Sequence, residues 1–526
     1  MTKVCGKPDS SFNEALRLRS EGLLAEAADT FRKILETCPD HLPSIVELGR
    51  TFYFQALMND SIEQYLKALR LNPLDAVVHN NLGIVFQEQG RTDEAIAEYQ
   101  RALELDPGYA MAHSNLLRCM NFHPDLDNAQ LFQAHTSFEI MQGALRRPGA
   151  DTFPNSKDSG RTLRIGYISP DLGNHSVAHF VTSVFRNHDR SRFKIFCYSD
   201  RGKEDTSSER IKKGVDVWRQ TFSMNDTALF SLIRSDAIDI LVDMAGHTGG
   251  NRLPLFAMRP APLQVTWLGY PNTTGLVNMD YRIVDAVTDP LGDADRYHSE
   301  TLVRLPNGFL CFDFPTKAPE VSPPPLVKNG FITYGSFNAL AKITDEAIAL
   351  WARILSRVPR SRFLFKNRCL FDKSTREALL ARFAKLGISS DRIMMTPFTL
   401  TTEEHLSSYR YLDISLDTFP YNGTTTTCES LMMGVPVVGI LGNRHASRVT
   451  ASILTRLGLD SMVGADADES VEIAVHLSER PELLQILRFC LGEKMRNSSL
   501  CNGPAFVSEL EDAYQRMWRT WCLADL

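Results

Sequence analysis

The chain has 526 residues, a formal net charge of −6 and ten cysteines. This length is enough for about three domains that each bury a core. The nearly balanced charge, without a basic block, argues against nucleic acid or an anionic membrane as a partner.

Two further features of the sequence indicate where in the cell the protein is located. The first ten residues are polar and charged, and no apolar run is long enough to cross a bilayer, so we expect neither a signal peptide nor a membrane span. The cysteines are scattered without C-x-x-C pairs or metal-ligand spacing. This pattern predicts free thiols, no metal site, and a cytoplasmic or nuclear location.

Residues 8 to about 120 repeat with a period of 34. Leu48-Gly49 recurs as Leu82-Gly83, and three prolines have the same spacing: Pro39, Pro73 and Pro107. A 34-residue period with small residues where helices cross is similar to the tetratricopeptide repeat. The expected units are 8–41, 42–75, 76–109 and a partial one over 110–147.

Stacked repeats of this kind form a helical solenoid with a concave groove. Asn81 and Asn115 are one period apart and would lie on a helix that faces the groove, where an amide can bond to an extended peptide. The same two residues could instead bond within the solenoid. The repeats therefore predict protein substrates bound along the groove, and a homodimer through the repeats is a further expectation.

A polar segment from Pro148 to Arg161 separates the repeats from a first α/β domain at 161–312. Its alternation of apolar strands and helices predicts an open parallel sheet covered on both faces. The expected strands are Leu163–Ile168, Phe193–Ser199, Ile238–Met244, Leu263–Trp267 and Tyr281–Val284, and the expected helices are Val177–Arg186 and Thr227–Arg234.

Residues 313–329 hold five prolines and read as a linker, after which the pattern restarts in a second domain at 330–505. Thr344 is expected to cap a helix there. The expected strands are Phe331–Phe337, Arg362–Lys366, Ile414–Leu416 and Val437–Leu441. Residues 506–526 form an aromatic-rich helix that should pack back on these domains. The fold class is thus an α-helical tetratricopeptide solenoid followed by an α/β unit of two Rossmann-like domains with a cleft between them.

The most informative stretch runs from Asp413 to Gly434. A buried strand and a turn lead into four threonines that begin a helix, where free N–H groups and the helix dipole suit a phosphate. Thr426 and Glu429 have the spacing of a capping box, and Gly434 ends the helix. A capped helix without a ligand would also explain the Thr426/Glu429 pair, but four threonines go beyond what capping needs.

Other loops at strand ends carry candidate functional side chains. Lys342 precedes a helix start and could reach a diphosphate, although a solvated lysine is the alternative. His175 lies at the corresponding turn of the first domain and His247 lies between glycines, so both are expected to face the cleft. His179 should be a packed residue. His445, in the segment that ends at Arg448, could serve either the nucleotide or a helix cap.

Several catalytic motifs are missing from these loops. The sequence has no Gly-x-x-x-x-Gly-Lys-Thr, no Gly-x-Gly-x-x-Gly after the first strand and no Gly-x-Ser-x-Gly. Kinase, simple dehydrogenase and hydrolase activities are therefore disfavoured.

From about residue 163 to 522, the chain resembles the nucleocytoplasmic O-glycosyltransferases that join tetratricopeptide repeats to a two-domain GT-B catalytic unit. The resemblance rests on four passages, which are Ser169–Ser176, Arg259–Gly275, Gly335–Thr344 and Leu416–Glu429.

Within that superfamily, two positions separate the branches. O-GlcNAc transferases usually have a histidine where this sequence has Thr424 and an aspartate where it has Glu429. The run Thr424–Ser430, together with Cys501–Phe506, is similar to the SPINDLY-type protein O-fucosyltransferases. This resemblance implies GDP-fucose as the donor and a protein Ser or Thr hydroxyl as the acceptor. Protein O-GlcNAc transfer from UDP-GlcNAc and an inactive repeat scaffold are the alternatives.

The resemblance also implies roles for the candidate residues. Transfer would be inverting and metal-independent, without a cofactor besides the nucleotide sugar. Lys342 and the helix start at Thr425–Thr427 would stabilise the leaving diphosphate, and His247 would hold the sugar or acceptor. His175 would orient or deprotonate the acceptor, with proton transfer to a phosphate oxygen of the donor as the alternative. Glu429 would bind a ribose hydroxyl. The expected donor-binding residues are Asn338, Thr424, Thr425, Thr426, Thr427, Glu429, His445 and Arg448.

Overall fold

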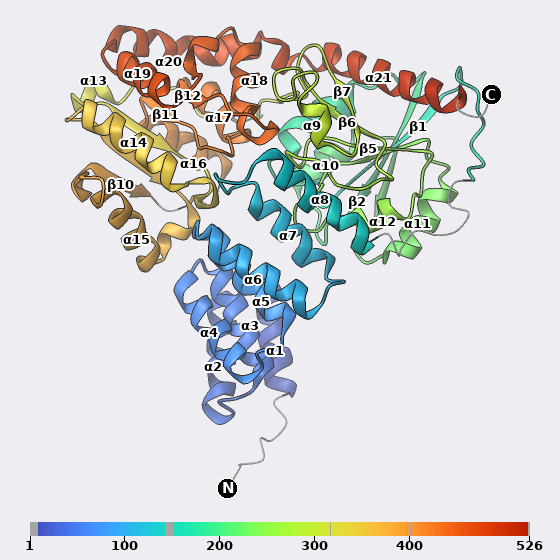
Figure 1. The fold of residues 1–526 in the computed structure, drawn as a ribbon, viewed down its shortest axis with the longest axis horizontal. Coiled ribbons are helices and arrows are strands. Elements are labelled where there is room, and N and C mark those ends of the chain that lie inside the picture. The colour runs from blue at the N-terminus through green and yellow to red at the C-terminus, as the bar shows by residue number, and fades with distance from the viewer. Residues whose placement is uncertain (1–8, 143–151, 316, 397, 400, 524–526) are drawn as a thin grey trace.

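The computed structural model describes residues 9–142 and 152–523, except 316, 397 and 400. Figure 1 shows a helical array that begins at Asp9 and two α/β domains next to each other, the first coloured green and the second yellow to orange. This arrangement confirms the predicted fold class. The end of the partial fourth repeat, at 143–147, and the first part of the predicted boundary segment lie outside the described residues.

The repeats consist of helices that pair in sequence, each pair packing on the next. Gly83 shows why the period carries glycine, because a Cβ there would lie 2.7 Å from the ring of Tyr99 in the partner helix. Gly49 stands in the same relation to Tyr65, at 2.9 Å. The helices are α1 (Asp9–Ser20), α2 (Leu24–Thr37), α3 (Leu42–Phe54), α4 (Met58–Leu71), α5 (Ala76–Glu88), α6 (Thr92–Leu105), α7 (Ala110–Met120) and α8 (Asn128–Gln142).

Asn115 does not face a groove. Its side chain is buried, and its Nδ2 donates a hydrogen bond to Oδ1 of Asn80 at 2.9 Å. The hypothesis that Asn115 binds a peptide is therefore wrong, and the alternative, bonding within the solenoid, holds for this residue.

The first α/β domain is built on a seven-stranded parallel sheet with the strand order β3-β2-β1-β4-β5-β6-β7. The sequence did not predict β3 or β7, which are four-residue strands at the two edges and are only partly buried. The strands are β1 (Leu163–Ser169), β2 (Phe193–Ser199), β3 (Val217–Gln220), β4 (Ile240–Asp243), β5 (Leu263–Thr266), β6 (Tyr281–Val284) and β7 (Thr301–Arg304). The helices are α9 (Ala178–Asn187), α10 (Thr206–Lys212), α11 (Asp226–Ser235) and α12 (Leu253–Ala257).

The second α/β domain repeats this topology in a six-stranded sheet, β10-β9-β8-β11-β12-β13. Thr344 caps α14 as predicted, since its hydroxyl accepts a hydrogen bond from the N–H of Ala347 at 3.2 Å. The strands are β8 (Thr333–Ser336), β9 (Arg362–Lys366), β10 (Ile393–Thr396), β11 (Ile414–Leu416), β12 (Val437–Ile440) and β13 (Val463–Gly464). The helices are α13 (Leu326–Asn329), which lies in the predicted linker, α14 (Asp345–Arg357), α15 (Lys373–Ala384), α16 (Thr402–Ser407), α17 (Thr425–Met432), α18 (Val449–Arg456), α19 (Ala467–Ser478) and α20 (Pro481–Arg496).

The last helix, α21 (Gly503–Leu523), leaves the second domain and packs on the first, along the top of Figure 1. Glu511 accepts a hydrogen bond from Nδ1 of the buried His188 at 2.8 Å, and the hydroxyls of Tyr514 and Tyr167 are 3.2 Å apart. The two sheet domains are therefore joined by a second chain passage as well as by the linker.

Cysteine pairing and membrane spans were both expected to be absent. Eight cysteines are free thiols, but Cys38 is disulfide-bonded, so the expectation of free thiols throughout does not hold at Cys38. Across the described ranges, no helix has both the length and the apolar character that a membrane crossing requires.

Candidate active site

Two neighbouring strands of the second sheet bring the main polar residues together. β8 and β11 pair in parallel, so their carboxyl ends meet at one edge of the sheet. Asn338, which follows β8, connects the two loops. Its Nδ2 lies 3.3 Å from Oδ1 of Asp417, and its Oδ1 accepts a hydrogen bond from the Thr426 hydroxyl at 2.9 Å. The loop after one strand thus fixes the helix that follows the other.

Asp417 organises the loop between β11 and α17. Its buried carboxylate accepts hydrogen bonds from the N–H groups of Thr418 and Gly423, both at 2.8 Å, and from the Thr450 hydroxyl at 2.6 Å. Burial raises the pKa of Asp417, although these bonds oppose the shift. Asp417 was not predicted as a site residue, although a carboxylate directly after an apolar strand is a usable signal.

The threonine-rich segment begins a helix, but not through the predicted capping box. α17 starts at Thr425, and Thr424 occupies the cap position without a side-chain hydrogen bond. Thr426 is therefore inside the first turn, where its hydroxyl bonds to Asn338 and not to the N–H of Glu429. The prediction of a Thr426/Glu429 capping box is therefore wrong, because Thr426 lies inside the helix and not at its cap position. The first-turn N–H groups have no partners within a helix, which leaves them for a ligand.

Lys342 lies directly beside this helix start. Its Nζ donates a hydrogen bond to the carbonyl oxygen of Asn422 at 2.7 Å and lies 4.2 Å from the centre of the Tyr421 ring. Burial lowers the pKa of Lys342 to about 8, although Asp417 opposes the shift. An anionic group bound here would restore the full charge of this lysine.

Glu429 takes part in a different cluster. Its carboxylate contacts Nε2 of His405 at 2.9 Å and the Tyr409 hydroxyl at 3.2 Å, while Nζ of Lys366 lies 2.6 Å from Nδ1 of His405. Burial lowers the pKa of Lys366 to about 8, against the opposing charge of Glu429. None of these three partners was predicted as a site residue, although Lys366 ends an apolar strand next to β8.

A cavity of about 130 Å³ lies between the two sheet domains. It brings together His175 of the first domain with Thr424, Thr425 and His445 of the second. Apolar side chains form much of its wall, among them Val177, Phe180, Leu268, Phe309 and Tyr421. His175 is exposed, and its Nδ1 lies 3.6 Å from the carboxylate of Asp171.

His247 does not face this cavity. It is fully buried beneath the repeats, with Nδ1 3.0 Å from the Ser114 hydroxyl and Nε2 2.8 Å from the Thr274 carbonyl. Burial lowers its pKa well below the ordinary value. The expectation that His247 holds the sugar or acceptor is wrong, because α7 and α8 cover the loop that carries it. His179 is packed, as expected, stacking on Phe312.

His445 and Arg448 connect the domains. Nδ1 of His445 lies 2.6 Å from the carboxylate of Asp289 in the first domain. Arg448 donates to the carbonyl of Val287 at 2.6 Å and to that of Gly442 at 2.8 Å. Both residues line a second cavity of about 260 Å³, and of the two only His445 also lines the smaller one. Arg448 lines the larger of these two cavities, and its contact with the donor stays a prediction.

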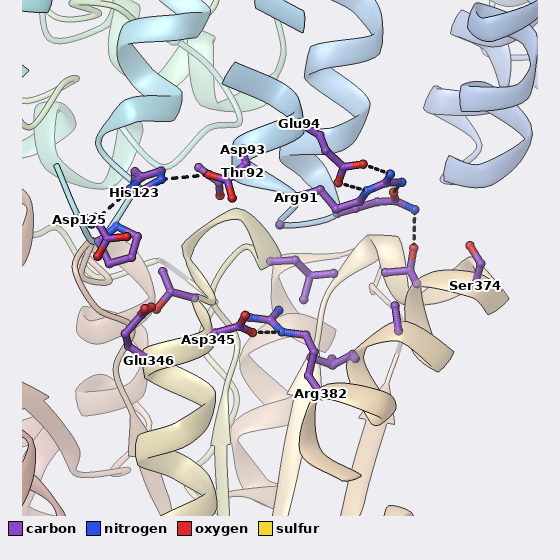
Figure 2. A pocket seen from close by; sticks show the side chains of 18 of the residues that line it. Arg91, Thr92, Asp93, Glu94, His123, Asp125, Asp345, Glu346, Ser374 and Arg382 are labelled. Carbon is purple, nitrogen blue, oxygen red and sulfur yellow. Dashed lines mark hydrogen bonds and ion pairs between the residues drawn. The ribbon is translucent and has the colours of Figure 1, made fainter. Parts of the chain in front are cut away.

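A wider opening of about 570 Å³ is lined by residues of the repeats and of the second domain (Figure 2). Asp93 and Asp125 face it from the repeats, and Glu346 faces it from the start of α14. The two guanidinium groups drawn there already pair with carboxylates, Arg91 with Glu94 and Arg382 with Asp345. This acidic lining does not suit a nucleoside diphosphate, so the smaller cavity beside Lys342 is the better candidate despite its size.

Comparison with known protein families matches residues 134–322 and 325–510 to Glycosyl transferase family 41. Residues 76–109 match the tetratricopeptide repeat, and 58–90 match a second repeat description. Over its whole length the fold is similar to a solved mutant of the Thermobaculum terrenum O-GlcNAc transferase, with a TM-score of 0.93, 33% identity and 100% of each chain covered.

Plant proteins are also similar in sequence. The chain is 43% identical over 415 residues to the Arabidopsis thaliana protein named probable UDP-N-acetylglucosamine–peptide N-acetylglucosaminyltransferase SPINDLY, covering 78% of this chain and 45% of that protein. A relative named SEC from the same plant is 32% identical, with 70% and 38% covered. The chain thus spans less than half the length of these two relatives.

Proposed function

This chain belongs to glycosyltransferase family 41, as a SPINDLY-type member of the superfamily shared with O-GlcNAc transferases, and from that premise we propose that it glycosylates Ser or Thr hydroxyls of proteins. The observation that carries the proposal is the cavity between the sheet domains. There a helix start rich in hydroxyls and His175 from the opposite domain face one space, and Lys342 lies beside that helix start.

In this proposal the nucleotide sugar binds with its diphosphate at the start of α17. The acceptor oxygen attacks the anomeric carbon, and the bond from that carbon to the phosphate oxygen breaks, so negative charge grows on the leaving diphosphate. Lys342 and the first-turn N–H groups of Thr425–Thr427 stabilise this charge. Attack from the side opposite the leaving group inverts the anomeric centre.

The remaining residues bind and orient. Glu429 and His405 lie close to the start of α17 and are candidates for holding the ribose and base of the nucleotide. His175 is exposed at the cavity and orients the acceptor. Protein acceptors approach from the repeats, in the cytoplasm or the nucleus.

For the donor sugar we propose GDP-fucose. The support is the pair of sequence departures, threonine at position 424 and glutamate at position 429. UDP-GlcNAc is the second candidate, and it is favoured by the printed names of the plant relatives, which refer to UDP-N-acetylglucosamine.

A thermal-shift measurement with GDP and with UDP separates these possibilities, because a ligand that binds the folded state raises its melting temperature. A shift with GDP alone supports fucosyl transfer, and a shift with UDP alone supports GlcNAc transfer. No shift with either nucleotide would support an inactive repeat scaffold and contradict the proposal.

Lys342→Ala tests the assignment of the site. We expect at least about a 100-fold loss of transfer from the radiolabelled donor, because removing one preorganised electrostatic contact commonly has this effect. The far-ultraviolet circular dichroism should stay unchanged. Lys385→Ala, at an exposed lysine, is the matched control. Normal turnover in the Lys342→Ala variant would contradict the assignment of the diphosphate site to this position.

A further inference from the structure

A histidine and a carboxylate from different domains meet at the edge of the cavity. His445 lies in the short turn after β12, and Asp289 lies in the loop after β6, 156 positions earlier in the chain. Nδ1 of His445 and Oδ2 of Asp289 are 2.6 Å apart, and the two residues are 6% and 1% exposed. The interaction is therefore a short, buried hydrogen bond across the domain boundary.

The hydrogen bond to Asp289 selects one tautomer of the His445 ring. Burial opposes ionisation of Asp289, but His445, with His298 and Arg282, outweighs it and lowers the pKa of the carboxyl. Nε2 of His298 is 3.8 Å from Oδ1 of Asp289, too far for a hydrogen bond. The tautomer of His445 that carries its proton on Nδ1 donates to Asp289 and has its lone pair on Nε2.

That nitrogen is free to meet a ligand. Among the residues that the structure describes, Nε2 of His445 has no hydrogen-bond partner. The ring is held edge-on to Phe309, with centroids 4.9 Å apart, and the residue lines the same cavity as His175, Thr424 and Thr425. Arg448, the nearby cation, is bound to two carbonyl groups. A fixed imidazole with an open acceptor nitrogen is the arrangement that a general base requires.

We propose that His445 is the general base of the transfer and that Asp289 is its positioning residue. This inference rests on the proposed function. The acceptor oxygen forms its bond to the anomeric carbon and gives its proton to Nε2 of His445. The bond between that carbon and the phosphate oxygen breaks, and its electron pair leaves with the nucleoside diphosphate. Asp289 then stabilises the imidazolium.

His175, the base candidate from the sequence, is less well suited. It is exposed, and its nearest carboxylate, Asp171, lies at 3.6 Å, outside hydrogen-bonding distance. Its Nδ1 accepts a hydrogen bond from the N–H of Val177 at 3.3 Å, so its ring is held by a backbone amide and not by a carboxylate as that of His445 is. In this division of roles His175 contacts and orients the acceptor, while His445 takes the proton.

The decisive variant is His445→Asn. An asparagine amide can donate to Asp289 from about the place of Nδ1 but has no atom at Nε2, so the contact between the domains is kept and the base is removed. We expect kcat to fall by about 100-fold or more, with the donor KM and the GDP-induced thermal shift unchanged. His476→Asn, at an exposed histidine on α19, should retain full activity.

A second measurement separates proton transfer from a structural role. In His445→Ala, added imidazole should restore part of the lost turnover, whereas it should not help Lys342→Ala. Wild-type kcat in His445→Asn, or an impaired His445→Ala that imidazole does not rescue, would overturn the inference. If the wild-type protein itself transfers from neither GDP-fucose nor UDP-GlcNAc, the proposed function fails, and the inference fails with it.

Discussion

The charge of Lys342 depends on what is bound beside it. Without a ligand, burial holds its pKa at about 8, and among the described residues its hydrogen-bond partner is the carbonyl of Asn422. A bound diphosphate favours the ammonium form, so above that pH binding takes up a proton. The residue therefore links nucleotide affinity to pH close to neutrality.

This linkage predicts the pH dependence of GDP binding. Between pH 7 and 9 the affinity should fall as the pH rises through about 8, approaching a tenfold loss per pH unit on the alkaline side. Isothermal titration calorimetry measures the dissociation constant directly. In Lys342→Ala the affinity for GDP should be lower at pH 7. Any pH dependence of the affinity that remains in this variant is attributed to Lys366, whose pKa is also about 8. A flat profile in the wild-type protein would contradict this role of Lys342.

At the level of single elements, Gly434 shows why α17 must end where it does. Its φ is +75°, and a Cβ there would lie 2.0 Å from the carbonyl oxygen of Arg488. Arg488 is itself buried and donates to the carbonyls of Tyr409 and Met433. The end of α17 therefore packs directly on the backbone of α20, which leaves no room for a side chain.

Gly434→Ala should accordingly destabilise the protein by more than about 2 kcal/mol, through the unfavourable φ and the clash together. Gly330→Ala is the matched control. Its φ is +69°, but a Cβ there meets nothing within 4 Å. The substitution should therefore cost only the strain of a left-handed backbone, about 1 kcal/mol. Urea denaturation followed by tryptophan fluorescence measures both variants. Equal midpoints for the two would show that the contact with Arg488 can relax.

Individual elements were predictable where one local signal decided them. Apolar runs located Phe193–Ser199, Arg362–Lys366 and Ile414–Leu416 with the observed bounds. The short edge strands β3 and β7 lack such a run. The sequence could not show that α8 covers His247, that Glu429 meets His405, or that Asp289 meets His445, because each contact joins residues brought together only by the tertiary fold.

On the scale of the whole molecule, the repeats and the first sheet domain form one packed body. The Tyr270 hydroxyl lies between α7 and α8 and is fully enclosed. It accepts a hydrogen bond from Nδ2 of Asn121 at 2.7 Å and lies 2.8 Å from Nε2 of His135. Burial lowers the pKa of His135 to about 4, so this ring is neutral and accepts the hydroxyl proton. A single oxygen thus satisfies two buried groups of the repeats.

Tyr270→Phe removes that oxygen, which takes the partner from Nε2 of His135 and leaves Nδ2 of Asn121 with its bond to the Leu117 carbonyl. We expect a loss of about 1 to 3 kcal/mol in the free energy of unfolding, seen as a lower midpoint in differential scanning fluorimetry. Tyr281→Phe is the control, since that half-buried ring has no hydroxyl hydrogen bond among the described residues. A Tyr270→Phe protein as stable as this control would show that water or a rearranged side chain replaces the hydroxyl.

The chain passes between the two sheet domains twice, at the linker and again before α21. The N–H of Phe312 donates to the carbonyl of Leu500 at 2.7 Å, so the two passages run side by side. If these adjacent passages serve as one pivot, rotation about them would widen the cleft without separating the domains. Such a rotation draws His445 away from Asp289. An enzyme that opens in this way to release its nucleotide would assemble the proposed base anew in every catalytic cycle, and only after closing.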